Sequence, residues 1–462
     1  MLHRLILFEA MALFLVRDCA GATRLAASCS LADVTAAYNL AGSGDIVSVP
    51  ACTATPWTSY LTISKSITIQ GAGGGQTVIT NGGTTKLFYI NLSSDVPVRI
   101  TGFYFTQDLH PAGEENAVYI NGKKDNSFPL TKVRIDNNYF YQGVDVIWAT
   151  GWLECLIDHN TFYNADRAII VIGDDDYAWN RTIAAGTSHA LFIEDNTFLA
   201  DNKVTWIFNE NLYQQQGART VVRYNNFDFH ACTVCTAFYD SHGNGTYYTG
   251  GTDFRGQPIL EIYNNTFHSY NTYSFGDFRG GSFLIWGNSF IEDTGAAKPW
   301  KWLSLTEEED YLKGEGHFSP LRTQWPAQDQ VNNSFLWNNT LCDNSSNCIA
   351  ITDIVLNTPN SSCTAASTPY ACCTGNGTGT CDDVFLQKDR DYFMHAPASS
   401  GGKASYTGSR AGGSTTAPTT DDTGSMSFSS SGANAYYPYT PFVYPHPLQS
   451  SLSAPQNLRV VK

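Results

Sequence analysis

Residues 153–166, LECLIDHNTFYNAD, carry the pattern that decides the fold. Here Ile157 is followed by Asn160 and Phe162, and this order of an aliphatic residue, an Asn and an aromatic residue (once Leu) returns along the chain. The further copies are Ile135/Asn138/Phe140, Ile193/Asn196/Phe198, Val222/Asn225/Phe227, Ile262/Asn265/Phe267, Ile285/Asn288/Phe290 and Leu336/Asn339/Leu341, with a degenerate first copy, Ile100/Phe103/Phe105. Each repeat is one structural unit, which can bury its apolar face only against its neighbours.

The spacing of the repeated Asn residues predicts what that unit is. Successive Asn residues are 22, 36, 29, 40, 23 and 51 positions apart, so the shortest step is one plain repeat and the longer steps contain insertions. Short β-branched and aromatic runs separated by Asn, Asp and Gly at this period are typical of a parallel β-solenoid. We expect the Asn residues to be structural, either as a stacked ladder or as turn residues that tolerate the left-handed conformation.

The repeated Ile-x-x-Asn-Thr-Phe motif resembles the rungs of secreted right-handed parallel β-helix proteins of the pectate-lyase-like superfamily. The resemblance covers residues 30–341 and implies an all-β solenoid whose open end is capped. Residues 30–42, SLADVTAAYNLAG, fit such a cap, because Ser30 is a good N-cap for a short helix and Gly42 follows its end.

The composition divides the chain into four expected parts. Residues 1–26 have a basic start, an apolar run and small residues, as in a signal peptide, or form a disordered leader. Residues 27–342 form the β-helix with its N-terminal cap, and residues 343–395 form a Cys-rich insertion with the last irregular rungs. Residues 396–462 are a low-complexity Gly/Ser/Thr-rich tail, in which the Tyr/Pro segment 435–447 is expected to lie extended against the coil.

Charge and length restrict the partners. The 462 residues carry a net charge of −15, which argues against nucleic acid or an acidic membrane face as a partner. No apolar stretch is long enough for a transmembrane helix. The sequence identifies no cofactor and no oligomeric state, although carboxylates on a solenoid face can hold Ca²⁺ that bridges to an acidic glycan.

The 12 Cys residues indicate disulfides and therefore a secreted, extracellular or cell-surface protein. The expected pairs are Cys29–Cys52, Cys232–Cys235 and Cys342–Cys348. The last four Cys residues are expected to pair among themselves, and a zinc site is the less favoured alternative because no His lies nearby. These four are Cys363, Cys372, Cys373 and Cys381.

A second run of apolar residues precedes each Asn motif, and these runs are expected to form the strands of one long face. They lie at residues 117–120, 144–148, 168–172, 204–208, 236–239, 273–275 and 300–303. Charged residues follow them, and strands about 4.8 Å apart would gather these charges on one face. Two carboxyls one or two rungs apart could then reach the separation of about 5–9.5 Å that glycosidases use.

This face supplies the candidate site residues. The candidate catalytic residues are Asp240, Asp277, Asp174, Asp175 and His242, and the candidate substrate-binding residues are Arg279, Arg255, Trp206, Tyr239 and Trp302; no metal ligand is proposed. The order of Asp174 and Asp175, then His242, then Arg279 is similar to that in polygalacturonase-type hydrolases, although their Asn-Thr-Asp element is absent.

Each choice has an alternative. Asp240 could cap a turn instead of exchanging protons. The tetrapeptide Asp-Phe-Arg-Gly occurs at 253–256 and at 277–280, so its Asp and Arg residues could form cross-rung ion pairs. The aromatic rings could stack on sugars or pack in the core.

The expected function is that of a secreted protein which binds and cleaves an extracellular polysaccharide, as a hydrolase or a lyase. The alternative is a non-catalytic glycan-binding adhesin, fibre or surface structural protein, because the fold does not decide between them.

Overall fold

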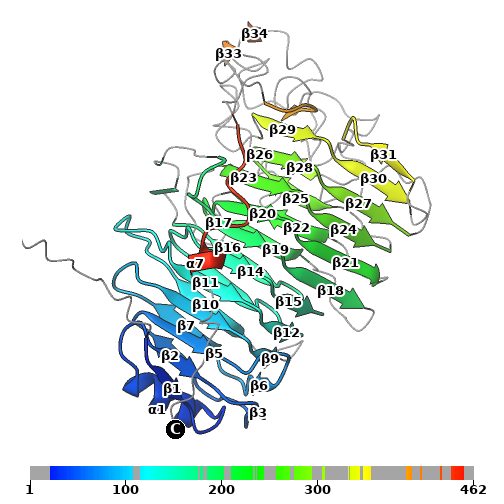
Figure 1. Cartoon of the computed structure of the whole chain (residues 1–462). Coiled ribbons are helices and arrows are strands. Elements are labelled where there is room, and N and C mark those ends of the chain that lie inside the picture. The colour runs from blue at the N-terminus through cyan, green and yellow to red at the C-terminus, as the bar shows by residue number, and fades with distance from the viewer. Residues whose placement is uncertain are drawn as a thin grey trace, which may run out of the picture.

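The computed structural model describes residues 21–107, 115–174, 177–178, 181, 185–201, 210–232, 235, 237–243, 256–270, 275–293, 304–306, 331, 333–343, 347–354, 392–397, 406–407, 427–428 and 439–451. These residues form a parallel β-helix, in which strands stack along one axis from the N-terminal helix α1 (Figure 1). No helix in the described part of the chain has the length and apolarity needed to cross a bilayer.

Three parallel sheets form the walls of the coil. The 12-stranded sheet consists of β1 (Thr23–Leu25), β2 (Ile46–Ser48), β5 (Ile67–Gln70), β8 (Val98–Thr101), β11 (Val133–Asp136), β14 (Leu156–Asp158), β17 (Leu191–Glu194), β20 (Thr220–Arg223), β23 (Gln257–Tyr263), β26 (Gly281–Trp286), β29 (Ser334–Trp337) and β32 (Tyr392–Phe393). The 11-stranded sheet consists of β3 (Cys52–Thr53), β6 (Thr77–Thr80), β9 (Tyr104–Thr106), β12 (Tyr139–Tyr141), β15 (Thr161–Tyr163), β18 (Thr197–Asp201), β21 (Asn226–Ala231), β24 (Thr266–Ser269), β27 (Ser289–Glu292), β30 (Thr340–Asp343) and β31 (Cys348–Ala350).

The 9-stranded sheet consists of β4 (Leu61–Ile63), β7 (Lys86–Asn91), β10 (Asn116–Asn121), β13 (Ile147–Thr150), β16 (Ile169–Ile172), β19 (Glu210–Gln215), β22 (Ala237–Ser241), β25 (Gly276–Arg279) and β28 (Ser304–Thr306). Only the β30–β31 pair departs from the parallel order of these three sheets among the described strands. A separate antiparallel pair joins β33 (Tyr406–Thr407) to β34 (Ser427–Phe428).

The repeated Asn residues form the expected buried ladder at the turn between the 12-stranded and 11-stranded sheets. The Nδ2 group of Asn160 donates to Oδ1 of Asn196 at 3.0 Å and to the carbonyl of Ile135 at 2.9 Å, and the backbone N–H of Asn160 donates to the same Oδ1 at 3.0 Å. The same bonds between neighbouring rungs connect Asn138, Asn160, Asn196, Asn225, Asn265, Asn288 and Asn339. The ladder therefore satisfies backbone groups that the tight turn buries.

The left-handed residue of each turn precedes the ladder Asn. His159 has φ 54° and Asp195 has φ 57°, and Asn137, Tyr224, Asn264, Gly287 and Asn338 take the same conformation. The ladder Asn residues are thus hydrogen-bonding residues and not the turn residues with positive φ.

The aromatic residues of the repeat stack inside the coil. Successive rings of Phe105, Phe140, Phe162, Phe198, Phe227, Phe267 and Phe290 have centroids 4.4–5.2 Å apart and lie within 16° of parallel. The aliphatic residue that precedes each Asn lies in the 12-stranded sheet and faces the same interior. Ile157, for example, is fully buried. The core is consequently one continuous column along the axis.

Helix α1 (Leu31–Leu40) closes the N-terminal end of this column (Figure 1). The Ser30 hydroxyl accepts from the backbone N–H of Asp33 at 3.2 Å, as expected for an N-cap. Val34 and Tyr38 of the helix are buried in the core cluster. The disulfide Cys29–Cys52 joins the helix to the start of the 11-stranded sheet, and Cys232–Cys235 and Cys342–Cys348 are also formed.

The seven predicted lining strands correspond to β10 through β28 of the 9-stranded sheet, whereas β4 and β7 were not among them, and the prediction is shifted along the chain most clearly at β19, β25 and β28. The strand paired with β16 is β19, with Leu212 beside Ile169, and not residues 204–208. The error has a physical reason, because β19 reads ENLYQQ and turns the buried polar side chain of Gln214 inward. The Gln214 amide is satisfied there by Ser241 at 3.1 Å and by Thr220 at 2.6 Å.

The second shift places candidate residues inside strands instead of after them. Strand β25 covers Gly276–Arg279 and not residues 273–275, so Asp277 and Arg279 are strand residues. Asp240 likewise belongs to β22. Residues 204–208 and 300–303, together with Cys363, Cys372, Cys373 and Cys381, lie outside the described residues.

Residues 439–451, which we call the C-terminal strap, lie along the outside of the 12-stranded sheet and end in α7 (Leu448–Ser451) (Figure 1). The strap covers an ion pair between Arg223 and Glu194, whose Nε and Oε2 atoms are 2.6 Å apart and fully buried. Arg223 donates to the carbonyls of Phe442 at 2.7 Å and Val443 at 3.0 Å, and Glu194 accepts from the N–H of His446 at 2.9 Å. The expectation that the Tyr/Pro segment lies against the coil is confirmed for this part.

Candidate functional site

One row of residues in register runs along the 9-stranded sheet, and we call it the outer row because the side chains from Tyr89 to Asp240 face away from the core. Its members are Cα partners on successive strands, namely Tyr89, Tyr119, Trp148, Ile170, Tyr213, Asp240 and Asp277. Val118 and Ile120, which flank Tyr119 in β10, are fully buried in the core because adjacent side chains of a strand point to opposite faces. At about 4.8 Å per strand the row is roughly 29 Å long.

A groove of about 500 Å³ lies over the middle of this row. Its floor contains Tyr119, Trp148, Ile170 and Tyr213, and a parallel file of Thr150, Ile172 and Gln215. Charged residues stand at its two edges, with Asp145 and Arg167 where the strands begin and Lys124 where they end. An apolar floor with a few polar groups at its edges is the usual composition of a ligand site.

The aromatic end of the row is ordered by ring contacts. The rings of Tyr119 and Trp148 are nearly parallel, at 11°, with centroids 6.3 Å apart. Tyr89 meets Tyr119 edge to face at 5.4 Å, and the Lys86 ammonium lies over both rings at 4.8–4.9 Å. Aromatic rings with one apolar face and polar edges suit the flat faces of sugar rings.

The acidic end of the row begins with a carboxylate–imidazole pair. Oδ2 of Asp240 lies 2.5 Å from Nε2 of His242, and the two residues are 1% and 7% exposed. The His242 ring packs against Tyr213, with centroids 4.9 Å apart, so the pair adjoins the groove floor. Asp240 is the last but one residue of β22, and a buried carboxylate–imidazole pair of this kind can hold and transfer a proton.

Asp277 lies next to Asp240 on the following strand, as the sequence predicts. The two residues are Cα partners although they are 37 positions apart in the chain. Arg279 is in the same strand two residues later. The structure describes the backbone of these two residues.

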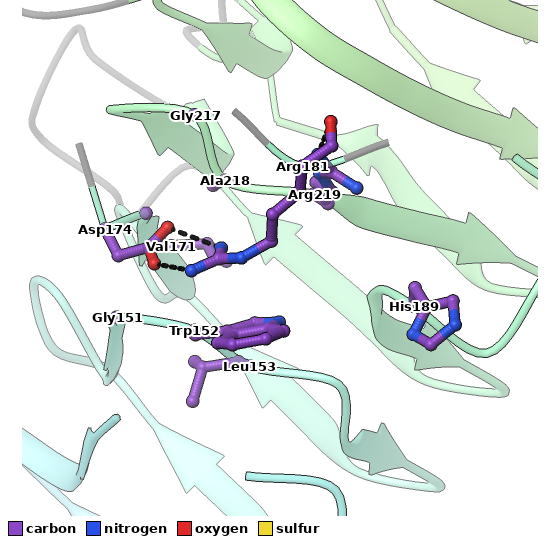
Figure 2. Close-up of a pocket in the computed structure, with 11 residues that line it drawn as sticks. Gly151, Trp152, Leu153, Val171, Asp174, Arg181, His189, Gly217, Ala218 and Arg219 are labelled. Atoms are coloured by element: carbon purple, nitrogen blue, oxygen red, sulfur yellow. Dashed lines mark hydrogen bonds and ion pairs between the residues drawn. The ribbon is translucent and has the colours of Figure 1, made fainter. Parts of the chain in front are cut away.

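Asp174 does not belong to the outer row. It follows β16, where both of its carboxylate oxygens bind Arg181, one of them at 2.9 Å from Nη1. Figure 2 shows the Arg181 guanidinium between Asp174 and the ring of Trp152, whose centroid is 3.6 Å away. The pocket around these residues has a volume of about 20 Å³, which is enough for a water molecule and too small for a sugar. Asp174 is therefore held in a structural ion pair.

Tyr239 lies inside the coil and not on the groove. It is 3% exposed, stacks on Phe278 at 5.6 Å and bonds through its hydroxyl to Thr220 at 3.0 Å. Tyr239 is therefore a core residue. Asp175, Arg255, Trp206 and Trp302 lie outside the described residues.

The groove also has residues that the sequence reasoning missed. Asp145 and Arg167 form an ion pair with 2.7 Å between Oδ1 and Nε, and they precede strands β13 and β16. The charges expected from the sequence follow the strands, so these two residues were not among them. Behind them, burial raises the pKa of Asp166 to about 7; the charge of Asp145 also raises this pKa, whereas Arg167 lowers it.

Among the described residues, a group with the composition and spacing of metal ligands lies on a different sheet. It consists of Asp228, His230 and His268, on the outside of the 11-stranded sheet. The signal in the sequence was their fixed offset from the ladder: Asp228 and His268 each follow a ladder Asn by three positions.

Comparison with known proteins identifies no family. No family model matches the chain, and a search of curated proteins finds no match.

Proposed function

We propose that this chain is a secreted carbohydrate-active protein that binds an extracellular polysaccharide along the outer row and cleaves it beside Asp240. One observation supports the proposal above all others: a single file of side chains leads from aromatic rings at Tyr119 and Trp148 to the acidic pair at Asp240 and His242. A sugar chain that stacks on the rings would lie with a glycosidic bond near the acidic pair. We also propose that the chain belongs to the pectate-lyase-like superfamily, on the basis of its parallel coil and helical cap.

The chemistry proposed for the acidic end is proton transfer by two carboxyls. Asp240 and Asp277 are partners on strands about 4.8 Å apart, near the shorter of the two carboxyl separations found in glycosidases. Crowded carboxylates do not ionise equally, so one can act as the acid that protonates the leaving oxygen while the other acts as base or nucleophile. His242 would orient Asp240, and Arg279 would hold a hydroxyl or carboxylate of the substrate.

Secretion is part of this proposal. Three disulfides among the described residues are compatible with an oxidising compartment. The division into a leader, a β-helix, a Cys-rich insertion and a low-complexity tail remains our proposal for the whole chain, as does Ca²⁺ as a bridge to an acidic glycan.

The burial of the acidic pair favours a second candidate function. Asp240 is 1% exposed and His242 7% exposed, so a bound chain has little access to them without movement of neighbouring groups. The groove would then bind a glycan without cleaving it, as in an adhesin or a surface structural protein.

The test is a screen of the purified protein against plant, algal and bacterial polysaccharides, with and without Ca²⁺, for binding and for release of new chain ends. Asp240→Asn should lower the rate at which new chain ends are released by at least about 100-fold. Glycan binding and melting temperature should stay nearly unchanged, because Asn keeps the shape of Asp and loses the ionisable group. Asp174→Asn, outside the groove, should retain release. Full activity in both Asp240→Asn and Asp277→Asn would refute the proposed site, and binding without any release would support the adhesin.

A further inference from the structure

The cluster on the 11-stranded sheet joins three neighbouring rungs. Asp228 and His230 are two residues apart in β21, so they point to the same outer face. His268 in β24 is the Cα partner of Asp228. Asp293 follows β27, the next strand of the sheet.

The donor atoms of the cluster converge. Oδ1 of Asp228 is bonded to Nδ1 of His230 and lies 3.7 Å from Nδ1 of His268. One donor atom from each residue falls within a common span of 4.8 Å. The two imidazole rings are stacked at 22°, with centroids 5.1 Å apart, which keeps both rings on the same side of the sheet.

Asp293 fixes the orientation of His268. Its Oδ1 atom lies 2.8 Å from Nε2 of His268. A hydrogen bond from Nε2 to this carboxylate leaves the lone pair of Nδ1 directed at Asp228. A carboxylate on the outer nitrogen is the arrangement that histidine ligands of metals commonly have.

We propose that Asp228, His230 and His268 bind a divalent transition metal, with Zn²⁺ as the ion that suits two imidazoles and one carboxylate. The metal would replace the proton that Oδ1 of Asp228 and Nδ1 of His230 share, and these two atoms would move apart so that each ligand reaches a bond length of about 2.0–2.2 Å. Three protein ligands leave a fourth position for water. Two carboxylates, Asp228 and Asp293, balance the charge of the ion.

A bound metal ion would cross-link neighbouring rungs of the coil. Its ligands come from two rungs and its supporting carboxylate follows the strand of a third, and the disulfide Cys232–Cys235 follows directly after β21. Because the cluster lies on the 11-stranded sheet and the groove on the 9-stranded sheet, metal binding can be tested without any carbohydrate substrate.

The experiment titrates Zn²⁺ into the untagged full chain, after removal of metal by a chelator, and follows heat and melting temperature. One ion per chain should bind and raise the melting temperature. His268→Ala and Asp228→Ala should remove this binding, and Asp293→Asn should weaken it by roughly 10- to 100-fold. His159→Ala is the matched control: His159 pairs with Asp158 at 2.7 Å, and the group formed by the proposed ligands does not include it.

Co²⁺ provides a second measurement that does not depend on stability. Bound at the proposed site it should give the intense visible absorption of low-coordinate Co²⁺, and this band should be absent in His268→Ala. Zn²⁺ binding that is equal in the wild type and in folded His268→Ala, or no binding to the wild type, would overturn the proposal. Loss of binding in His159→Ala but not in His268→Ala would do the same.

Discussion

Single side chains of the Asn ladder stabilise the coil by satisfying groups that it buries. The Oδ1 atom of Asn160 accepts from both the backbone N–H and Nδ2 of Asn138, at 3.0 and 3.1 Å. Its Nδ2 group donates to the carbonyl of Ile135 at 2.9 Å and to Asn196. A residue without an amide at this position leaves buried donors and an acceptor without hydrogen-bond partners. The free-energy cost of such an unsatisfied buried group exceeds the average net contribution of one hydrogen bond.

We therefore expect Asn160→Ala to lower the free energy of unfolding by roughly 1–3 kcal/mol. Asn91→Ala is the control, since Asn91 is exposed at the end of β7 and accepts one hydrogen bond from Asn121. Its effect should stay within about 0.5 kcal/mol. Chemical unfolding of both variants measures the difference, and equal effects would contradict the role of the ladder.

Asp166 is a residue whose burial makes stability depend on pH. Its pKa is raised to about 7, chiefly by burial, whereas the unfolded chain releases this proton near the ordinary value of 3.8. Between these two values the folded state binds more protons than the unfolded state, so the contribution of Asp166 is favourable below about pH 4 and is lost as the pH rises to about 7.

Asp166→Asn should remove this dependence. The unfolding free energy of the variant, relative to the wild type, should rise by up to a few kcal/mol between pH 4 and pH 8, at no more than about 1.4 kcal/mol per pH unit. Urea unfolding across this range tests the prediction. Parallel pH profiles of the two proteins would show that Asp166 is already ionised in the folded state.

At the scale of elements, the C-terminal strap completes the outer face of the 12-stranded sheet. The buried guanidinium of Arg223 finds two of its acceptors on the strap, at Phe442 and Val443. The Phe442 ring packs on Phe192 with centroids 5.2 Å apart. The strap therefore supplies two acceptors to Arg223 and covers its ion pair with Glu194.

Phe442→Ala should loosen the strap and lower the free energy of unfolding by roughly 1–3 kcal/mol, less than for a fully buried Phe. Limited proteolysis should then cut within residues 439–451 earlier than in the wild type. The neighbouring Val443→Ala is a fitting control, because Val443 is 58% exposed. If both variants are as resistant as the wild type, the ring contact does not hold the strap.

The same scale shows which elements the sequence could predict. Strands with the Ile/Asn/Phe repeat were predictable because their period is regular and one face of each is apolar. Strand β19 was not, because its inward Gln214 is polar and its partners Ser241 and Thr220 come from other strands. The surface on which the strap lies could not be predicted from the sequence either, because Glu194 and Arg223 look like solvent-exposed charges there.

At the scale of the whole molecule, the coil brings distant residues into register without any local motif. The pairing of Asp240 with Asp277 was predictable from the rungs alone, since each rung repeats the last. The ion pair of Asp174 with Arg181 was not, because Arg181 lies beyond β16 in an insertion outside the repeat. The strands of the groove floor were predictable, since Tyr119 and Trp148 lie in the predicted runs 117–120 and 144–148, whereas the candidate Tyr239 lies in the core.

The most direct test for a polysaccharide site in the groove is the affinity of the Trp148→Ala variant for a glycan that the wild type binds. Tyr139→Ala is the matched control, because Tyr139 stacks on Tyr104 at 4.8 Å on the 11-stranded sheet and is likewise half-buried. Stacking on the outer row predicts that Trp148→Ala binds at least about 10-fold more weakly, or about 1.4 kcal/mol, whereas Tyr139→Ala binds like the wild type. Wild-type affinity in Trp148→Ala, or a loss confined to Tyr139→Ala, would contradict a glycan site on the 9-stranded sheet.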